Sequence, residues 1–278
     1  MICGCPRSGT TALVDLLNCH PDIAASNERF ARLIGPKKKI TRAHFTTERY
    51  MDFQEGDCGE AAFSNAKSAL GREKWADAKW VIDKMPSVYH CLSVAARLPF
   101  DAVVAIFRDP LSIAMSYEAR LRNALAGKDS TWRHSNDYER AVQDFNRDIK
   151  ILNEQSKLSD AERGYRLLVV EYTELYKSNG RHNEIYEFLG LDPSLAFGIE
   201  NVLSHDNDER QRELVARRYV TDHANIGAYR ELTGAQDWGQ NAQKTVRSIV
   251  FQQIAQMVLG KSPNRKKLKP EEPPRGAL

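Results

Sequence analysis

The sequence predicts an α/β protein in which a parallel sheet is flanked by helices. Two observations predict this fold. A glycine-rich turn near the N-terminus lies between a short apolar segment and a helical pattern, and three later apolar segments are also followed by helical patterns. Strands that alternate with helices favour parallel pairing, because a parallel connection needs a long crossover that is usually a helix. The 278 residues are enough for one such domain.

The glycine-rich turn, residues 4–11 with the sequence GCPRSGTT, has the glycine spacing of a P-loop. It follows the apolar residues 1–3 and precedes a helical pattern formed by Leu13, Leu16 and Leu17. A strand, a glycine-rich turn and a helix N-terminus bind phosphate through backbone N–H groups and the helix dipole. The first strand is short, which leaves open whether residues precede Met1.

Thr10 stands where ATP-using P-loops have the lysine that reaches the β- and γ-phosphates. A cation comes earlier instead, at Arg7. The pattern therefore predicts a nucleotide ligand that is not ATP used as a phosphoryl donor. The residues expected to bind it here are Arg7, Ser8, Gly9, Thr10 and Thr11.

Three further apolar segments are predicted strands, at residues 80–83, 102–107 and 167–170. The helical patterns that follow them cover residues 87–98, 111–126 and 183–189. The carboxyl ends of parallel strands meet at one edge of a sheet, and α/β sheets bind their ligands there. Each predicted strand is followed closely by a polar residue, and these four residues are therefore expected near one rim of the sheet: Arg7, Lys84, Arg108 and Tyr172.

The rest of the chain is organised around this sheet. Residues 31–75 and 128–165 are more polar and are predicted to be helical insertions over the active-site rim. Residues 240–259 form an amphipathic helical pattern, and we expect a single domain over residues 1–260. Residues 261–278 hold six Lys or Arg, two Glu and four Pro, so a disordered basic tail is predicted.

Charge and cysteine content exclude several classes of protein. The net charge is +3, of which the tail contributes +4, so the remaining body is near −1 and nucleic-acid binding is not expected. No apolar run reaches the roughly 18–20 residues that span a bilayer, and the N-terminus shows no signal-peptide pattern. We therefore expect a cytoplasmic protein. The five cysteines lack a C-x-x-C pair, so reduced thiols and no metal site are expected.

A second motif begins at Arg108, directly after the predicted strand 102–107. Pro110 suits the first turn of the helix that follows, and Ser116 and Arg120 then share one helix face. The side chains of Arg108, Ser116 and Arg120 would form a second anion site beside the P-loop. The alternative is an Arg–Asp surface pair and a serine at a helix contact. Coupled to the P-loop, the motif favours a nucleotide with two separate phosphate positions.

With these motifs the chain resembles the sulfotransferase family, whose donor is 3′-phosphoadenosine 5′-phosphosulfate (PAPS). The family's P-loop variant, Pro-Arg/Lys-x-Gly-Thr-Thr, matches residues 6–11, and its Arg and Ser eight residues apart match Arg108 and Ser116. The resemblance extends through residues 171–175 and 188–191, over most of residues 1–230. It implies PAPS as donor, adenosine 3′,5′-bisphosphate as product, and no required metal.

Among the branches of that family, the chain is most similar in motif to tyrosylprotein-type and related bacterial sulfotransferases. Residues 17–23 and 27–28 resemble their "L-x-x-H-P-D" and Glu-Glu segments, which places their catalytic glutamate on Glu28. Their post-strand lysine falls on Lys84, and their donor contacts fall on Arg120 and Tyr172. Asn27 replaces the first Glu of the pair, and the C-terminal donor segment is only faintly visible near residues 226–230.

The resemblance gives each catalytic residue a role. Glu28 would take the proton of the acceptor hydroxyl as general base, while Arg7 and Lys84 would neutralise charge on the departing bisphosphate. Glu28 beside Arg29 is also open to the interpretation of a surface ion pair, and His90 is an alternative base.

Two rival functions are a P-loop nucleotide or sugar kinase and a non-catalytic nucleotide-binding protein of the same fold. The sequence names neither the acceptor nor the oligomeric state. A glycan, lipid or small natural product is favoured as the acceptor.

Overall fold

The computed structural model describes residues 1–33, 40–54, 56–57, 72–95, 100–176, 181–203 and 214–233. All of these lie within one compact unit, Met1–Gln236. The predicted helix at 240–259 and the basic tail at 261–278 lie outside the described residues, so the predicted domain boundary stays a prediction.

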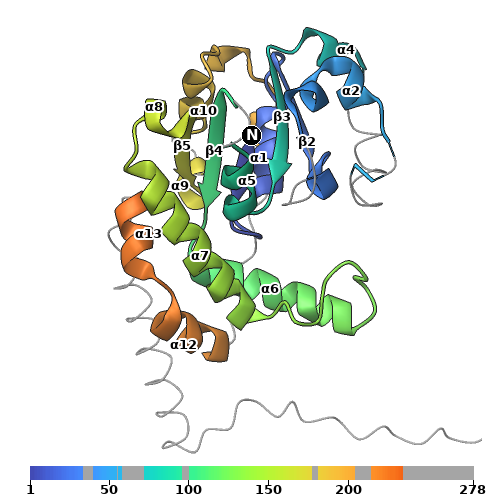
Figure 1. Ribbon diagram of the computed structural model, residues 1–278. Coiled ribbons are helices and arrows are strands. Elements are labelled where there is room, and N and C mark those ends of the chain that lie inside the picture. Colours follow the sequence, from blue (N-terminus) through green and yellow to red (C-terminus); the bar gives the residue numbers. More distant parts are fainter. Residues whose placement is uncertain are drawn as a thin grey trace, which may run out of the picture. The chain divides into compact units, whose positions relative to one another are not determined.

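A five-stranded sheet with the order β2-β3-β1-β4-β5 forms the centre of the described chain (Figure 1). Its strands are all parallel: β1 (Ile2–Gly4), β2 (Ile23–Asn27), β3 (Trp80–Met85), β4 (Ala102–Phe107) and β5 (Arg166–Glu171). The α/β fold predicted from the sequence is therefore confirmed. All six residues of β4 are buried, as expected for an inner parallel strand covered on both faces.

Strand β2 was not among the strands predicted from the sequence. Its residues, IAASN, include only one β-branched side chain, and alanine and asparagine have low β-propensity. The strand forms because Ile23, Ala24 and Ala25 are buried and because every residue from Ile23 to Asn27 pairs with β3. Strand β3 also extends two residues beyond the predicted end, so Lys84 lies within the strand.

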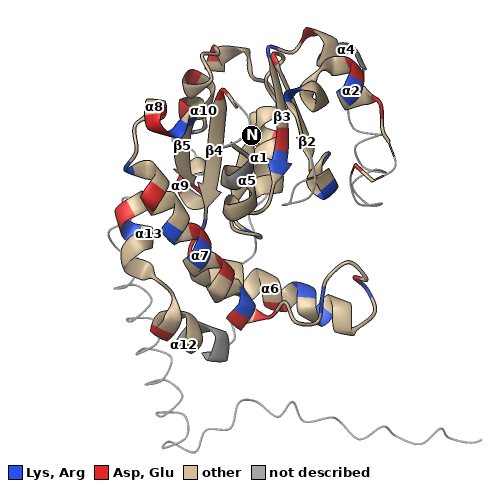
Figure 2. Ribbon diagram, in the orientation of Figure 1, with Lys and Arg blue, Asp and Glu red and all other residues tan. Residues whose placement is uncertain are grey.

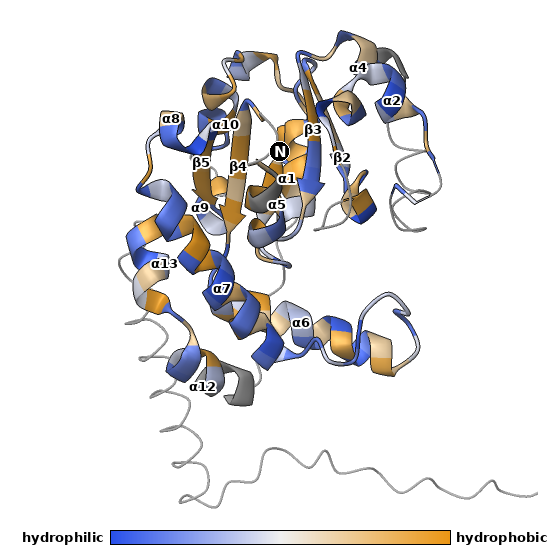
Figure 3. Cartoon of the chain, viewed as in Figure 1, coloured by the Kyte–Doolittle hydropathy of each residue, from blue (hydrophilic) through white to orange (hydrophobic). Residues whose placement is uncertain are grey.

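Helices cover both faces of the sheet. On one face, α1 (Thr10–Leu17) and α10 (His182–Phe188) share a hydrophobic cluster with the strands, in which Leu13, Leu16 and Ile185 are fully buried. On the other face lie α5 (Val88–Ala95) and α7 (Tyr138–Ser156), which are drawn in front of the sheet in Figure 1. Helix α6 (Pro110–Leu125) packs against α7 and lies beyond the carboxyl ends of the strands, below the arrow tips in Figure 1. Figure 3 shows the contrast between the hydrophobic strand β4 and the hydrophilic outer side of α7.

The described part of segment 31–75 packs against the edge strand β2. It contains η1 (Ala31–Leu33), η2 (Arg42–Phe45), α2 (Thr47–Met51) and α4 (Arg72–Asp77). Its core is an aromatic cluster in which Phe30, Tyr50 and Trp75 are buried beside Ala24. Figure 1 shows α2 and α4 beside β2. This part of the segment therefore packs against β2 and against Phe30, which follows the strand. Residues 34–39, 55 and 58–71 of the segment lie outside the described chain.

Segment 128–165 forms mainly the amphipathic helix α7, which packs along α6, α5 and α13 (Ile226–Thr233) rather than over the rim. Its buried side chains include Val142, Phe145, Ile149 and Leu152. In the connection between α6 and α7, Asp129 lies close enough to Arg7 for their charges to interact. The remaining described elements are α8 (Asp160–Arg163), α9 (Tyr172–Tyr176), η3 (Pro193–Leu195), α11 (Ile199–Leu203) and α12 (Leu214–His223). Across the described ranges, no helix is both long and apolar enough to cross a membrane.

Candidate active site

The glycine-rich loop that was predicted to be a P-loop, residues 4–11 and called the P-loop below, connects β1 to α1. Gly9 is the N-cap of α1, with φ 97°, and it offers no side chain to the helix N-terminus. Arg7 also has a positive φ of 74°, which turns the loop sharply. The hydroxyl of Ser8 is buried and has no hydrogen-bond partner among the described residues. An uncapped helix start with a buried donor beside it suits an anion.

Two glycines of this loop allow close approach by neighbouring groups. A Cβ on Gly4 would lie 2.4 Å from the carbonyl oxygen of Ile106, and one on Gly9 would lie 2.3 Å from Cδ2 of Tyr172. Real Cβ contacts are never this short, so both positions need glycine. The loop is thus packed directly against the ring of Tyr172, the first residue of α9.

A cluster of arginines lies beside the loop. The Nε of Arg7 donates to Oγ of Ser116 at 2.8 Å, which joins the P-loop to helix α6. The guanidinium of Arg108 lies 4.3 Å from the ring centroid of Tyr172. Burial, followed by the nearby charges of Arg120 and Arg108, lowers the pKa of Arg7. Within the part of the chain that the structure describes, neither Arg7 nor Arg108 forms an ion pair with a carboxylate. These cations are therefore available to a ligand.

Helix α6 presents Ser116 and Arg120 as the sequence predicts. Asp109 caps the helix by accepting from the N–H of Ser112, and Pro110 occupies its first turn. The residues 116 and 120 are one helical turn apart and therefore share a face. Figure 2 shows the charged residues distributed along α6 and α7.

Arg120 has a protein partner that the sequence did not reveal. Its Nη2 lies 2.6 Å from a carboxylate oxygen of Asp129, and its guanidinium lies 4.5 Å from the ring centroid of Trp132. Hydrogen bonds from Thr131 and then Arg120 lower the pKa of Asp129 to about 2. No motif marks Asp129, because it lies in the polar connection between α6 and α7 and meets Arg120 only through the fold.

Two of the three predicted catalytic residues, Glu28 and Lys84, lie together near the carboxyl ends of the neighbouring strands β2 and β3. The Nζ of Lys84 is 2.8 Å from Oε1 of Glu28 and 3.4 Å from Oγ1 of Thr11. The Lys84 side chain is 5% exposed, whereas that of Glu28 is 39% exposed. Lys84 thus lies between the P-loop and the carboxylate, and Glu28 is the more exposed of the two side chains.

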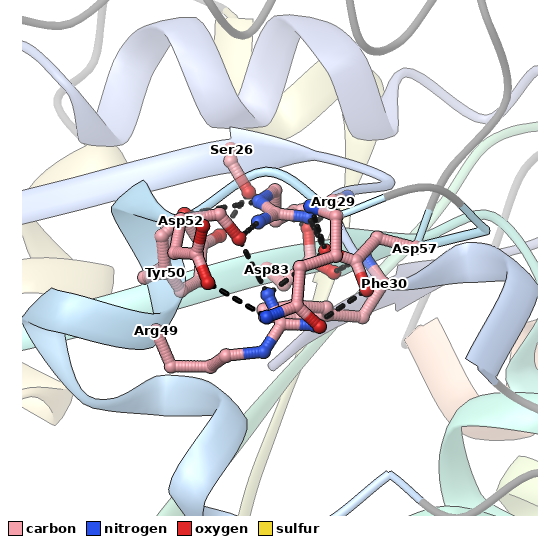
Figure 4. Close-up of polar contacts among 9 residues, drawn as sticks. Ser26, Arg29, Phe30, Arg49, Tyr50, Asp52, Asp57 and Asp83 are labelled. Atoms are coloured by element: carbon pink, nitrogen blue, oxygen red, sulfur yellow. Dashed lines mark hydrogen bonds and ion pairs between the residues drawn. The ribbon is translucent and has the colours of Figure 1, made fainter.

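Arg29 is not part of a surface pair with Glu28, so that alternative interpretation is wrong. Its side chain is fully buried and lies 2.6 Å from the carboxylate of Asp57. It also donates to the carbonyl oxygens of Tyr50 and Asp52, as Figure 4 shows. Arg29 therefore ties the turn that carries Glu28 to the segment around α2.

Three other residues near these elements have local roles. His20 is fully buried, accepts from the N–H of Asp22 and lies 3.0 Å from the carbonyl oxygen of Asp192, so it stabilises a turn. His90 lies on the exposed side of α5, and its ring centroid is 5.2 Å from that of Tyr89. Trp75 stacks on Tyr50 at 4.2 Å within the aromatic cluster.

Among the described residues, no group of three or more His, Cys, Asp or Glu side chains is placed to hold a metal ion. The polar groups gathered here are instead guanidinium, ammonium, hydroxyl and backbone N–H groups, which bind phosphate and sulfate oxygens.

A family model described as "Sulfotransferase family" matches residues 1–194, which contain the P-loop, the Glu28–Lys84 pair and the arginine cluster. The chain belongs to the sulfotransferase family. No curated protein matches it.

Solved sulfotransferases resemble the chain distantly. One, from Alicyclobacillus acidocaldarius, is 14% identical with a TM-score of 0.47, over 84% of this chain and 96% of its own. Another, mouse sulfotransferase SULT7A1 complexed with PAP, is 16% identical with a TM-score of 0.41, over 89% of this chain and 87% of its own. At these scores neither structure assigns a residue to the site.

Proposed function

We propose that the protein transfers a sulfuryl group from PAPS to a hydroxyl of an acceptor. One observation supports this most strongly. Arg7 of the P-loop is bonded to Ser116 of α6, and Arg7 and Arg108 have no carboxylate partner among the described residues. This arrangement offers two adjacent anion sites. A nucleotide with a single phosphate chain would need only one of them, whereas a 3′,5′-substituted nucleotide would occupy both.

The residues present fit such a donor. The buried Ser8 hydroxyl and the uncapped start of α1 would bind the 5′-phosphosulfate, together with Gly9, Thr10 and Thr11. Arg108 and Ser116 would bind the 3′-phosphate. Since Oγ of Ser116 accepts from Arg7, its hydroxyl proton remains available to donate to a phosphate oxygen.

Arg120 and Tyr172 complete the proposed donor contacts in different ways. Arg120 adds positive charge near Arg7 but shares it with Asp129. The ring of Tyr172 packs against Gly9 and also against the guanidinium of Arg108, so it would help to set the spacing of the two proposed anion sites.

When bound, PAPS would supply an activated sulfuryl group and a bisphosphate leaving group. Lys84, held against Thr11 at the edge of the P-loop, places an ammonium where negative charge develops. Glu28 is within 2.8 Å of the same ammonium and is the more exposed of the pair. It is therefore positioned to accept the proton of an entering hydroxyl, a role worth about 10²–10⁴-fold in rate.

The proposal is tested by supplying PAPS with panels of glycans, lipids and small natural products and measuring acceptor mass. We expect one panel member to gain a single sulfo group, and Glu28→Gln to abolish the gain. Matched reactions with ATP and Mg²⁺ cover the kinase alternative. A phospho group gained from ATP, with no sulfo group gained from PAPS, would contradict the proposal. Binding of the bisphosphate with no transfer to any panel would favour a non-catalytic nucleotide-binding protein.

A further inference from the structure

We propose that Asp83 is a positioning residue that holds the turn carrying Glu28 at the correct distance from Lys84. The inference rests on the proposed function, since it concerns how the base and the ammonium are held. It is drawn from the contacts of a buried carboxylate that no motif explains.

Asp83 accepts hydrogen bonds from both sides of Glu28. Its Oδ1 accepts from Oγ of Ser26 at 2.8 Å and from the backbone N–H of Arg29 at 2.9 Å. Its Oδ2 accepts from the N–H of Phe30 at 3.1 Å. One carboxylate therefore holds the end of β2 and the two residues that follow Glu28.

The same carboxylate also holds the strand that carries Lys84. Oδ1 of Asp83 accepts from the N–H of Lys84 at 3.0 Å. The N–H of Glu28 donates to the carbonyl oxygen of Lys84 at 3.0 Å. The backbones of the two catalytic residues are thus joined directly to each other, and each is joined to Asp83 or to a neighbour that Asp83 holds.

Strand geometry explains why adjacent residues have these separate tasks. Successive side chains of a strand point to opposite faces. Lys84 points to the face with Thr11 and Glu28, while Asp83 points to the face with Ser26 and Phe30. The catalytic ammonium and the positioning carboxylate therefore lie on opposite sides of β3.

The turn needs such support because Glu28 has a positive φ of 56°. A non-glycine residue in this region is strained and persists when its surroundings fix it. The buried Arg29 anchors the far side of the turn through Asp57 and the carbonyl oxygen of Tyr50, while Asp83 holds the backbone (Figure 4). The strained residue is thus the one that carries the proposed base.

Asp83 does not itself reach an acceptor. The residue is 1% exposed, and both of its oxygens already accept hydrogen bonds from the protein. Burial raises the pKa of its carboxyl, against the effect of the N–H and O–H donors around it. It acts on the chemistry only through the position of Glu28.

The test is Asp83→Asn in the full-length protein, which keeps the size of the side chain but sets an NH₂ group against at least one N–H donor. We expect kcat to fall by about 10- to 100-fold, the range associated with a misplacement of about 1 Å. The KM for PAPS and the Kd for adenosine 3′,5′-bisphosphate should stay within about threefold. Hydrogen exchange of the amides of residues 28–30 should accelerate, while residues 103–107 of the inner strand β4 keep their protection.

Asp57→Asn is the matched control. Asp57 is as buried as Asp83 and also contacts Arg29, but through the guanidinium rather than the backbone of the turn. Because Arg29 keeps its hydrogen bonds to the carbonyl oxygens of Tyr50 and Asp52, we expect this variant to lose stability but to lower kcat several-fold less than Asp83→Asn does. If Asp83→Asn does not fold, Ser26→Ala removes one of its contacts, and a kcat decrease of about three- to tenfold with unchanged donor KM is expected.

Any of three results would overturn the proposal. One is a wild-type kcat in Asp83→Asn, and another is an equal loss of kcat in Asp83→Asn and Asp57→Asn. The third is unchanged hydrogen exchange at the amides of residues 28–30 in Asp83→Asn. The exchange measurement needs no acceptor, so it decides whether Asp83 holds the turn even if the wild-type protein transfers no sulfuryl group.

Discussion

Substituting Gly9 by alanine should damage the fold and the nucleotide site together. An L-residue at the left-handed φ of Gly9 costs roughly 1–2 kcal/mol. The new Cβ would also lie 2.3 Å from the ring of Tyr172, and overpacking of this kind costs about 1–3 kcal/mol. The Tyr172 ring cannot simply rotate away, since Arg108 and Tyr176 lie 4.3 and 4.6 Å from it. We expect a total loss of about 2–5 kcal/mol in the free energy of unfolding.

The assay is denaturant unfolding, combined with titration of adenosine 3′,5′-bisphosphate. Gly164→Ala is the matched control, because Gly164 has a φ of 76° but nothing within 4 Å of its Cβ position. The Gly164→Ala variant should lower the free energy of unfolding only by the backbone cost, about 1–2 kcal/mol. Its affinity for the bisphosphate should be unchanged. Gly9→Ala should weaken that affinity at least tenfold by displacing Tyr172 from Arg108.

A double variant separates the two costs of the Gly9 substitution. Tyr172→Ala removes the ring, so Gly9→Ala should cost less in that background, by roughly the overpacking share of 1–3 kcal/mol. Equal destabilisation by Gly9→Ala and Gly164→Ala, with no coupling to Tyr172, would refute the proposed packing of the loop against α9.

Three further predictions follow from individual side chains. Arg108→Ala should raise the Kd for the bisphosphate by about tenfold or more, and Ser116→Ala by less, because a hydrogen bond to a charged group contributes about 1.5–3 kcal/mol. Calorimetric titration of each variant with the bisphosphate and with 5′-AMP checks this. If both variants still prefer the bisphosphate over 5′-AMP as strongly as the wild-type protein does, the prediction is contradicted. Glu28→Gln should lower kcat by about 10²–10⁴-fold with bisphosphate affinity within about threefold, and near wild-type turnover would place the base elsewhere. Burial raises the pKa of Asp148 from 3.8 to about 6, so the folded state binds this proton more tightly than the unfolded state, and the stability from this group falls as pH rises from about 4 to 6. Asp148→Asn should remove this fall, of at most about 3 kcal/mol, in unfolding measured across that range, and an identical pH profile in both proteins would refute it.

Much of the site could be predicted because it depends on local sequence. A P-loop is a continuous turn whose glycines and hydroxyls follow a short strand, so the position of Arg7 and Ser8 in a loop between a strand and a helix could be predicted from spacing alone. Arg108 and Ser116 lie at a strand end and on the next helix, where strand and helix periods fix their direction. The contact between Arg7 and Ser116 confirms that the two motifs form one region.

The unpredicted parts depend on contacts between distant segments. Strand β2 has weak β-propensity and forms through its pairing with β3 and its buried alanines. The ion pair between Arg120 and Asp129 spans the end of α6 and the following connection, where no pattern marks an acidic partner. The four contacts of Asp83 likewise require β2 and β3 to be paired first, so a lone Asp before a Lys gave no signal.

The central claim is that two adjacent anion sites bind one nucleotide carrying both a 3′- and a 5′-substituent. Calorimetric titration of adenosine 3′,5′-bisphosphate, 5′-AMP and Mg²⁺-ATP into the wild-type protein tests it most directly. At about 1.5–3 kcal/mol for a hydrogen bond to a charged group, the 3′-phosphate should make the bisphosphate bind about ten- to a hundredfold more tightly than 5′-AMP, with or without EDTA. Equal affinities for the bisphosphate and 5′-AMP, or tighter binding of ATP that depends on Mg²⁺, would contradict the account.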